Sequence, residues 1–560
     1  MKDKREFLAI LRAVDGLPAS EYGRLVGDFD FGRFVIHVPQ APSVSQGEAC
    51  GMFVVHVPQL IAGFPSKLFS TPMRRTALED YLGRRLVEAV GRHISVRGPG
   101  EARIRVPSIG RQVLPRSLIV ASQDYVEARL AICLPLRDGS VDSAGAVQLF
   151  FHTLPAVVNE SLVYCYLDVQ DLQRFVDLME DVDHARRQLE RRGLVAFIGD
   201  GTRLQPTGAP LELPSEGLVE LDVPNRGVQH GLGIPLGVTV IVGDPYSGRQ
   251  DLIAALANGV YNHVPDDGCE WVVSVPDTVR VDAEPGRSVQ AVDIAAFRPA
   301  ASGRSGRWLT ADRATSLDSQ MAGVVEAIHA GARVVLFDES SSDPAFLTGD
   351  VRAGGLRADA PVDFLSLAAR ARDLASGLRI SMIVGVFAHV EEFLDVADTV
   401  LLLENHRLRD VTATARQLPR TARAERAVPS LPAIDGKMRQ IIPTSIDPSF
   451  GAEDAFIQAL ELTRLRFGRY ELDLRGVPQL VDIAQTAAIG LLMYHARLRH
   501  LDEVRTFPEL LDQLDEDLAS EGLAMLSREL RGDLARPRRY EIAAAMNRLR
   551  SLRIAAPNSD

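Results

Sequence analysis

A short apolar run, a glycine-framed loop and a helix-forming segment follow one another in this chain of 560 residues, and they constrain its fold most. Residues 238–242 read as a buried strand, and residues 251–258 read as a helix that stops at Gly259. The loop at 243–250 has the glycine spacing of G-x-x-x-x-G-K-[ST], in which backbone N–H groups cradle phosphates. This order of elements predicts a phosphate-binding turn.

The residue types in the loop depart from that pattern at its last two positions. Arg249 stands where the pattern has lysine, and Gln250 stands where it has a hydroxyl that binds magnesium. Arginine and lysine are not interchangeable where geometry matters. The candidate nucleotide contacts are Gly243, Asp244, Tyr246, Ser247, Gly248, Arg249 and Gln250.

A second apolar run, residues 332–337, ends in two acids, Asp338 and Glu339. In P-loop ATPases the first acid belongs to the magnesium shell, and a polar group nearby orients the attacking water. The metal-ligand candidates are therefore Asp338 and Gln250, and Glu339 is a catalytic candidate. The alternative is that the two acids only cap the end of a strand.

Alternating strand and helix patterns over residues 236–404 predict an α/β core with helices on both faces of a sheet. We expect a mixed α+β domain at 1–160, the core at 161–440 and a mostly helical domain at 441–560, after a strand at 467–474. In the first domain, residues 6–14 and 76–90 read as helices.

The bulk composition narrows the class of protein. No uninterrupted apolar run approaches the roughly 20 residues of a membrane helix, and the charged first residues do not resemble a secretory signal. The four cysteines (Cys50, Cys133, Cys165 and Cys269) form no CxxC pair, so we expect reduced thiols in a cytoplasmic protein and neither a disulfide framework nor a zinc site. The formal net charge of −12 argues against indiscriminate coating of nucleic acid.

Short stretches in order along nearly the whole chain resemble the predicted ABC-class ATPases that carry their own N- and C-terminal domains and are not transporters. The most distinctive is Gly259-Val260-Tyr261-Asn262-His263. Others are residues 32–34, 62–65, 127–129, 193–197, 232–239, 286–289, 395–400 and 479–482. The resemblance implies an ABC-type core, ATP and Mg²⁺ as cofactors, and a head-to-tail dimer, as a homodimer or with a related ATPase. It also raises a nucleic-acid role for the flanking domains.

Two further candidate regions come from this resemblance. Residues 315–320 correspond to the signature loop that meets the γ-phosphate bound by the other subunit, which makes Ser319 and Gln320 nucleotide-contact candidates. His389 corresponds to the switch histidine and is a catalytic candidate, with a plain surface histidine as the alternative.

The departures from the family pattern fall in segments that would meet at one site. The family loop resembles Gly-Gly-Gly-Tyr-His-Gly-Lys-Ser/Thr, whereas this chain has Asp244, a negative charge, and Pro245, which has no N–H to donate. Asp318 brings an acid into the signature segment. We therefore expect weakened nucleotide binding, little or no hydrolysis, and a regulatory or scaffolding role. The alternatives are an active ATPase acting on RNA or DNA, and an adaptor that uses no nucleotide.

Two arginine-rich stretches are the features that favour nucleic acid. One is the linker at 404–440, and the other contains Arg528, Arg531, Arg536, Arg538 and Arg539. A solvated helix surface, balanced by Glu529 and Asp533, is the preferred interpretation of the second. No membrane partner is expected.

Overall fold

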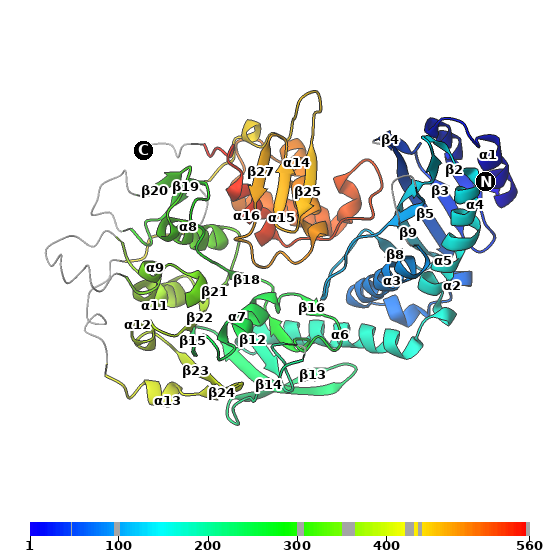
Figure 1. Cartoon of the computed structure of the whole chain (residues 1–560). Helices are drawn as coiled ribbons and strands as arrows, with labels where there is room; N and C mark the ends of the chain where they lie inside the picture. The colour runs from blue at the N-terminus through cyan, green and yellow to red at the C-terminus, as the bar shows by residue number, and fades with distance from the viewer. Residues whose placement is uncertain are drawn as a thin grey trace. The chain divides into compact units, whose positions relative to one another are not determined.

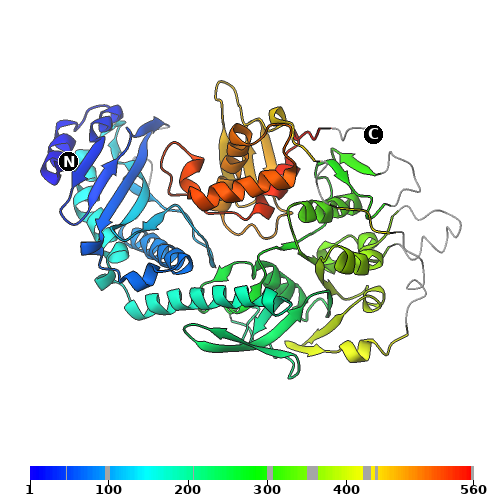
Figure 2. The ribbon, with the colours of Figure 1, turned by 180° about the vertical axis from the view of Figure 1, so that it is seen from behind.

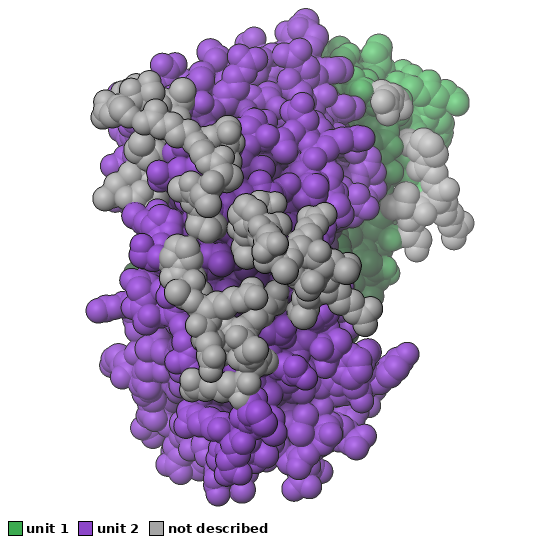
Figure 3. All heavy atoms as spheres, turned by 90° about the vertical axis from the view of Figure 1, so that its left-hand side faces the viewer, with its two compact units in different colours: residues 1–180, 521–536 green, residues 181–520, 537–560 purple. Residues whose placement is uncertain are grey.

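The computed structural model describes residues 1–45, 47–94, 101–205, 207–298, 307–349, 364–419, 430–434 and 439–555. The chain divides into two compact units, coloured separately in Figure 3. Unit 1 comprises residues 1–180 and 521–536, and unit 2 comprises residues 181–520 and 537–560.

Unit 1 is built on a mostly antiparallel sheet with the strand order β1-β2-β3-β5-β9-β6 (Figure 1). Its centre is the long pair β5 (Glu48–Pro58) and β9 (Tyr125–Leu134). The remaining strands on this path are β1 (Lys2–Asp3), β2 (Gly27–Asp30), β3 (Val35–Val38) and β6 (Arg103–Arg105). The helices predicted at 6–14 and 76–90 are confirmed as α1 (Lys4–Ala13) and α3 (Pro72–His93).

A disulfide joins Cys50 on β5 to Cys133 on β9. The two cysteines lie directly opposite each other in the antiparallel register, with their Cα atoms 4.0 Å apart. The prediction of four reduced thiols is therefore wrong for this pair. A separation of 83 residues in the sequence hid a pairing that the strand register creates. Cys165 and Cys269 are free thiols.

A segment from near the end of the chain completes unit 1. The Ser117 N–H donates to the Leu534 carbonyl at 2.9 Å, and the Arg536 N–H donates to the Pro115 carbonyl at 2.9 Å. Residues 521–536 thus leave the C-terminal helices and return to them, which the predicted linear division of the chain did not include.

The main sheet of unit 2 has the strand order β18-β21-β22-β15-β23-β24, in which β24 runs antiparallel and the other strands are parallel. Its strands are β18 (Thr278–Arg280), β21 (Val334–Asp338), β22 (Ser381–Val386), β15 (Val238–Val242), β23 (Thr399–Glu404) and β24 (Arg407–Asp410). The nearly continuous burial of β15, β21 and β22 is typical of parallel strands covered on both faces. The predicted α/β core is confirmed.

Helices on this sheet bury apolar side chains in one continuous core that includes Val240, Phe337 and Val384. They are α8 (Ser316–His329), α9 (Pro344–Thr348), α11 (Leu367–Gly377) and α12 (Glu391–Leu394). Helix α7 (Arg249–Asn258) buries Leu252, Ile253 and Leu256 outside this cluster. A second, antiparallel sheet has the order β13-β14-β12-β17. Its strands are β13 (Leu218–Val223), β14 (Gly227–Pro235), β12 (Leu194–Gly199) and β17 (Val272–Ser274).

The C-terminal part of unit 2 combines a small sheet with helices. The orange helices α14 (Ile483–Arg499) and α15 (Phe507–Ser520) lie beside strands β25 to β27 in both of the opposite views (Figure 1, Figure 2). The strands are β25 (Ile457–Glu461), β26 (Arg464–Phe467) and β27 (Tyr470–Asp473), followed later by α16 (Arg539–Arg548). The strand predicted at 467–474 is found as β27, which is shorter because Phe467 ends β26 and Gly468, with φ of +57°, turns the chain between the two strands.

Candidate nucleotide site

The order of the parallel strands brings the candidate residues together. Strands β21, β22 and β15 are neighbours, so the segments that leave their carboxyl ends meet at one edge of the sheet. These segments are the glycine loop after β15, the acids at the end of β21 and residues 387–389 after β22. Ligands of open α/β sheets bind outside this edge.

The glycine loop donates hydrogen bonds to itself. Asp244 accepts the Tyr246 N–H on Oδ1 at 2.9 Å and the Ser247 N–H on its carbonyl at 3.2 Å. The Arg249 N–H donates to Ser247 Oγ at 3.3 Å, and Pro245 has no N–H. Phosphate-binding loops work by aiming successive amides at the anion. Three amides of this loop are instead directed to the loop's own oxygens, in a turn that Asp followed by Pro favours.

Arg249 points its side chain under the loop, toward the sheet. Its Nε and Nη2 atoms donate to the two carboxylate oxygens of Asp338 at 3.2 and 3.3 Å, and its Nη1 donates to the Gly243 carbonyl at 3.0 Å. The side chains of Arg249 and Asp338 are 3 % and 1 % exposed. The cation expected at the phosphates and the acid expected at the magnesium therefore form a buried ion pair with each other.

The residues present do not fit a magnesium ion in this arrangement. Asp338 accepts hydrogen bonds from the Ser340 N–H at 2.9 Å and from the Ser340 hydroxyl, in addition to those from Arg249. Magnesium requires near-ideal octahedral geometry around oxygen ligands. Gln250, the other predicted metal ligand, is exposed in the first turn of α7.

Glu339 and His389, the two catalytic candidates, are in contact. His389 Nδ1 lies 2.6 Å from Glu339 Oε1, and the same carboxylate accepts the N–H groups of Phe387 and Ala388, the latter at 3.0 Å. Partial burial opposes ionisation of this carboxyl. The hydrogen bonds from Phe387, His389 and Ala388 outweigh it and hold the pKa of Glu339 below its ordinary value.

This lowered pKa predicts a pH-dependent contribution of Glu339 to stability. A carboxyl whose pKa is depressed by folding stabilises the protein above its unfolded pKa, and this stabilisation is lost as the pH falls through the folded pKa. We expect Glu339→Gln to lower the free energy of unfolding at pH 7. The difference from wild type should shrink as the pH falls below 4.5, the ordinary pKa of a glutamate carboxyl. Urea unfolding of both proteins between pH 7 and pH 3 measures this, and a difference independent of pH would contradict it.

The segment predicted as a signature loop begins α8. Thr315 caps the helix by accepting the Asp318 N–H at 3.1 Å, and Asp318 pairs with Arg298 at 2.9 Å. Ser319 and Gln320 are buried. Ser319 Oγ accepts the Glu284 N–H, which joins α8 to the segment after β18. Gln320 donates to Ser342 Oγ at 2.8 Å and accepts the Asp343 N–H at 2.8 Å, which joins α8 to the segment after β21. Nucleotide contact by Ser319 and Gln320 stays a prediction.

The distinctive run at 259–263 connects the core of unit 2 to the C-terminal part of the same unit. Arg186, which is buried, donates to Asn262 Oδ1 at 2.7 Å and to the carbonyls of Gly259 and Tyr261. Burial lowers the pKa of Arg186 to about 10, so it stays charged at neutral pH. The Tyr261 hydroxyl donates to the Gln479 carbonyl at 3.0 Å, which ties the core to the C-terminal part.

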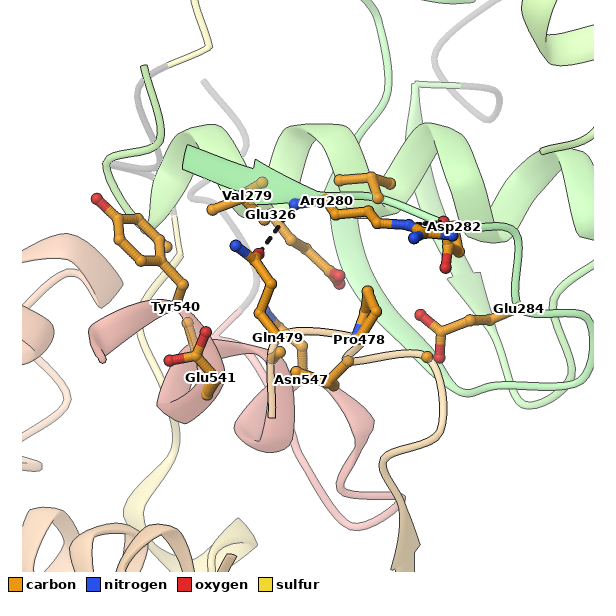
Figure 4. Close-up of a pocket in the computed structure, with 18 of the residues that line it drawn as sticks. Val279, Arg280, Asp282, Glu284, Glu326, Pro478, Gln479, Tyr540, Glu541 and Asn547 are labelled. Atoms are coloured by element: carbon orange, nitrogen blue, oxygen red, sulfur yellow. Dashed lines mark hydrogen bonds and ion pairs between the residues drawn. The ribbon is translucent and has the colours of Figure 1, made fainter. Parts of the chain in front are cut away.

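A hollow lies in the same region of unit 2, lined by β18, α8, residues 476–479 and α16. Figure 4 shows Gln479 reaching the Arg280 N–H, which donates to it at 3.0 Å. Arg280 pairs with Asp282 at 2.9 Å, and Glu326 pairs with Arg287 at 2.8 Å. These charges are already paired within the protein, and the lining described does not include the glycine loop.

Several of the arginines considered for nucleic acid have acidic partners within the chain. Arg531 pairs with Asp533, Arg538 with Glu541, and Arg539 with Asp512 and Asp515. In the linker, Arg407 pairs with Glu212 and Arg409 with Glu404, whereas Arg420, Arg423 and Arg426 lie outside the described residues. The predicted helix surface is wrong for Arg528, Arg531, Arg536 and Arg538, since α16 begins only at Arg539, and nucleic-acid binding stays a prediction.

Sequence reasoning missed the residues that hold the candidates in place. Ser340 and the amides of Phe387 and Ala388 bind the two acids, and Arg186 fixes the run at 259–263. Only Ser340 carried a signal, since a hydroxyl directly follows the two acids. Backbone donors and a distant arginine leave no local pattern.

No helix within the described ranges is both long and apolar enough to cross a bilayer. A search among curated proteins gives no match. One solved structure that matches is titled "Structure of a bacterial Atm1-family ABC exporter with ATP bound", at 15% identity and a TM-score of 0.17. The match covers 48% of this chain and 50% of that chain, so this chain spans about half the exporter's length.

Three family models match the chain in order. The N-terminal model of the ABC-class ATPases matches residues 4–165, the ABC ATPase P-loop domain matches residues 168–436, and the MRB1590 C-terminal domain matches residues 457–555. The division at 1–160, 161–440 and 441–560 stays a prediction beside these ranges. The chain belongs to the ABC-class ATPases that carry their own N-terminal and C-terminal domains.

Proposed function

We propose that this protein is a regulatory or scaffolding member of the ABC-class ATPases in which nucleotide binding is weakened and hydrolysis is low or absent. The observation that carries the proposal is the buried ion pair between Arg249 and Asp338. It engages, within the chain itself, the cation and the acid that a P-loop ATPase uses for the phosphates and the magnesium.

The ion pair opposes binding of Mg·ATP in energetic terms. For the phosphates to gain a cation, Arg249 must leave Asp338, and removing one partner of a buried pair costs about 3–5 kcal/mol. At 1.4 kcal/mol per factor of ten, this lowers affinity by roughly two to three orders of magnitude. The ligand would recover part of this only if it neutralised both freed charges.

The loop adds a second obstacle. The amides of Tyr246, Ser247 and Arg249 would have to break their hydrogen bonds within the loop before they could reach a phosphate. Asp244 adds a negative charge at the same place, and like charges about 4 Å apart repel by about 1 kcal/mol in water and more at a lower dielectric.

Hydrolysis meets a third obstacle at Glu339. A general base works best when its pKa lies near the working pH, but the pKa of Glu339 is lowered. Its carboxylate already accepts hydrogen bonds from the turn at 387–389. Such a carboxylate suits a structural anchor for that turn better than a base.

The proposed setting follows from the family. We place the protein in the cytoplasm, where ATP is supplied. Its partner is a second ATPase chain of the same class, identical or related. Nucleic acid is not the partner that the paired arginines favour.

A turnover assay tests the proposal. We expect purified, tag-free wild type and Glu339→Gln to release phosphate from Mg·ATP at the same background rate. Removing a working catalytic group commonly costs a factor on the order of 10²–10³ in rate. A wild-type rate that falls by this factor in Glu339→Gln would contradict the proposal and support the alternative of an active ATPase.

A further inference from the structure

Two histidines and an aspartate converge where α14 and α15 meet. His495 lies near the end of α14, His500 is the residue that caps the end of this helix, and Asp517 lies on α15. His495 Nε2 is 2.8 Å and His500 Nε2 is 2.6 Å from the same oxygen, Asp517 Oδ2. The three ligand atoms all lie within 4.8 Å of one another. From this arrangement we propose that His495, His500 and Asp517 bind one zinc ion.

The donor types select the class of metal. Two imidazole nitrogens and one carboxylate oxygen suit zinc and its first-row neighbours, whereas magnesium and calcium prefer oxygen ligands alone. Three protein ligands leave a fourth position for water, as in zinc sites with two histidines and a carboxylate. Zinc is the ion we assign, and magnesium serves as the ion that should not bind.

The geometry requires only a small adjustment. In a tetrahedral zinc site with bonds near 2.0–2.1 Å, the ligand atoms lie about 3.3 Å apart. The two nitrogens are hydrogen-bonded to Asp517 at shorter distances, so an ion entering between them must spread the ligands by about half an ångström. Side chains at the surface ends of two helices can move this far without repacking a core.

The three side chains of the cluster are mostly buried but remain partly accessible to solvent. Both imidazoles are 11 % exposed and Asp517 is 23 % exposed. The ligands are therefore held by the protein, and Asp517 remains partly accessible to solvent.

Several other histidines each pair with a single carboxylate. Examples are His37 with Asp28, His93 with Glu160, and His263 with Asp267. The second group of metal-binding residue types in the described ranges is Glu48, Cys50 and Cys133, but its two sulfur atoms are bonded to each other. Among the described residues, the cluster on α14 and α15 is therefore the one that offers three independent ligands.

Zinc in this position would fasten α14 to α15. His495 and His500 belong to the first helix and its cap, and Asp517 belongs to the second, so the ion would cross-link two segments joined by the loop at 501–506. Because an ion that binds only the folded state stabilises it, melting should become zinc-dependent. The inference does not rest on the proposed loss of nucleotide binding.

The experiment uses the full chain with its affinity tag removed and its metals stripped by a chelator. Zinc is titrated in competition with a chromophoric chelator, and cobalt is titrated as a spectroscopic substitute. We expect one zinc ion per chain, a rise in melting temperature with zinc but not with magnesium, and visible cobalt bands of a four-coordinate site. Affinity should fall at least tenfold in His495→Ala, in His500→Ala and in Asp517→Asn, since even outer-shell changes commonly cost 10–100-fold.

His37→Ala is the matched control, because it removes a histidine paired with one carboxylate and should leave zinc affinity unchanged. Asp517→Asn keeps the shape of the side chain and guards against loss of fold in the histidine variants. Equal affinity in wild type and in all three cluster variants would overturn the proposal. So would a failure of wild type to retain zinc, or a thiolate-to-cobalt charge-transfer band, which would assign the ion to Cys165 or Cys269.

Discussion

Replacing Arg249 by alanine is expected to lower the free energy of unfolding by about 3–5 kcal/mol, the usual cost of removing one partner of a buried ion pair. The change leaves the Asp338 carboxylate, which is 1 % exposed, with hydrogen bonds from Ser340 but without its cation. Urea unfolding monitored by circular dichroism measures the difference. A matched control is Arg407→Ala, whose pair with Glu212 has both side chains at least two-thirds exposed, so it should cost less than about 1 kcal/mol.

A double-mutant cycle separates the ion pair from general damage to the fold. In Arg249→Ala with Asp338→Asn, no uncompensated charge remains, so the loss should be smaller than the sum of the two single losses. Coupling of directly interacting residues is typically about 0.5–3 kcal/mol. Additive losses would mean that Arg249 and Asp338 do not stabilise each other. The proposal that their ion pair opposes nucleotide binding would then be wrong.

Restoring the loop to the ATPase pattern is expected to give the second large effect. The variant Asp244→Gly, Pro245→Gly, Arg249→Lys and Gln250→Ser should bind Mg·ATP at least about a hundredfold more tightly, because about 3 kcal/mol of opposing interaction is removed. A lysine has a single ammonium group and cannot make the two-point contact that the Arg249 guanidinium makes with Asp338. The glycines return amides and remove a negative charge.

The control for this variant carries the same loop with methionine in place of lysine at position 249. It restores the amides but supplies no cation, so its affinity should stay well below that of the lysine variant. A fluorescent ATP analogue titrated with and without magnesium measures both. If the lysine and methionine variants bind equally, the cation is not what the site lacks.

The strand, loop and helix at 238–258 could be predicted because apolar burial and glycine spacing are local properties of the sequence. The same holds for the acids at 338–339 and for their proximity to the loop after β15. The direction of the Arg249 side chain could not be predicted. Whether a guanidinium extends to a ligand or folds back depends on the Gly243 carbonyl and Asp338, which come from different segments.

Long-range pairings were the other limit. Cys50 and Cys133 are isolated in sequence, and only the register of β5 on β9 places them opposite each other. Likewise, His495, His500 and Asp517 form no recognisable spacing until α15 packs on α14. The strand predicted at 467–474 is present as β27, but its start was misplaced for a local reason, because Gly468 permits a turn that an apolar pattern does not reveal.

The sequence identified Glu339 and His389 as candidate site residues, but it did not determine what either residue does. Both were catalytic candidates, and they lie 2.6 Å apart. The same contact that unites them also supplies a donor that lowers the pKa of Glu339, which suits an anchored turn. Proximity of predicted residues is therefore separate from the chemistry they perform.

Calorimetric titration of Mg·ATP into tag-free wild-type protein, with the lysine-restored loop variant titrated beside it, measures how strongly the buried ion pair opposes nucleotide. Wild type is expected to bind Mg·ATP more weakly than this variant by about two orders of magnitude or more, because Arg249 and Asp338 must separate first. Wild-type binding as tight as that of the restored variant would contradict this expectation.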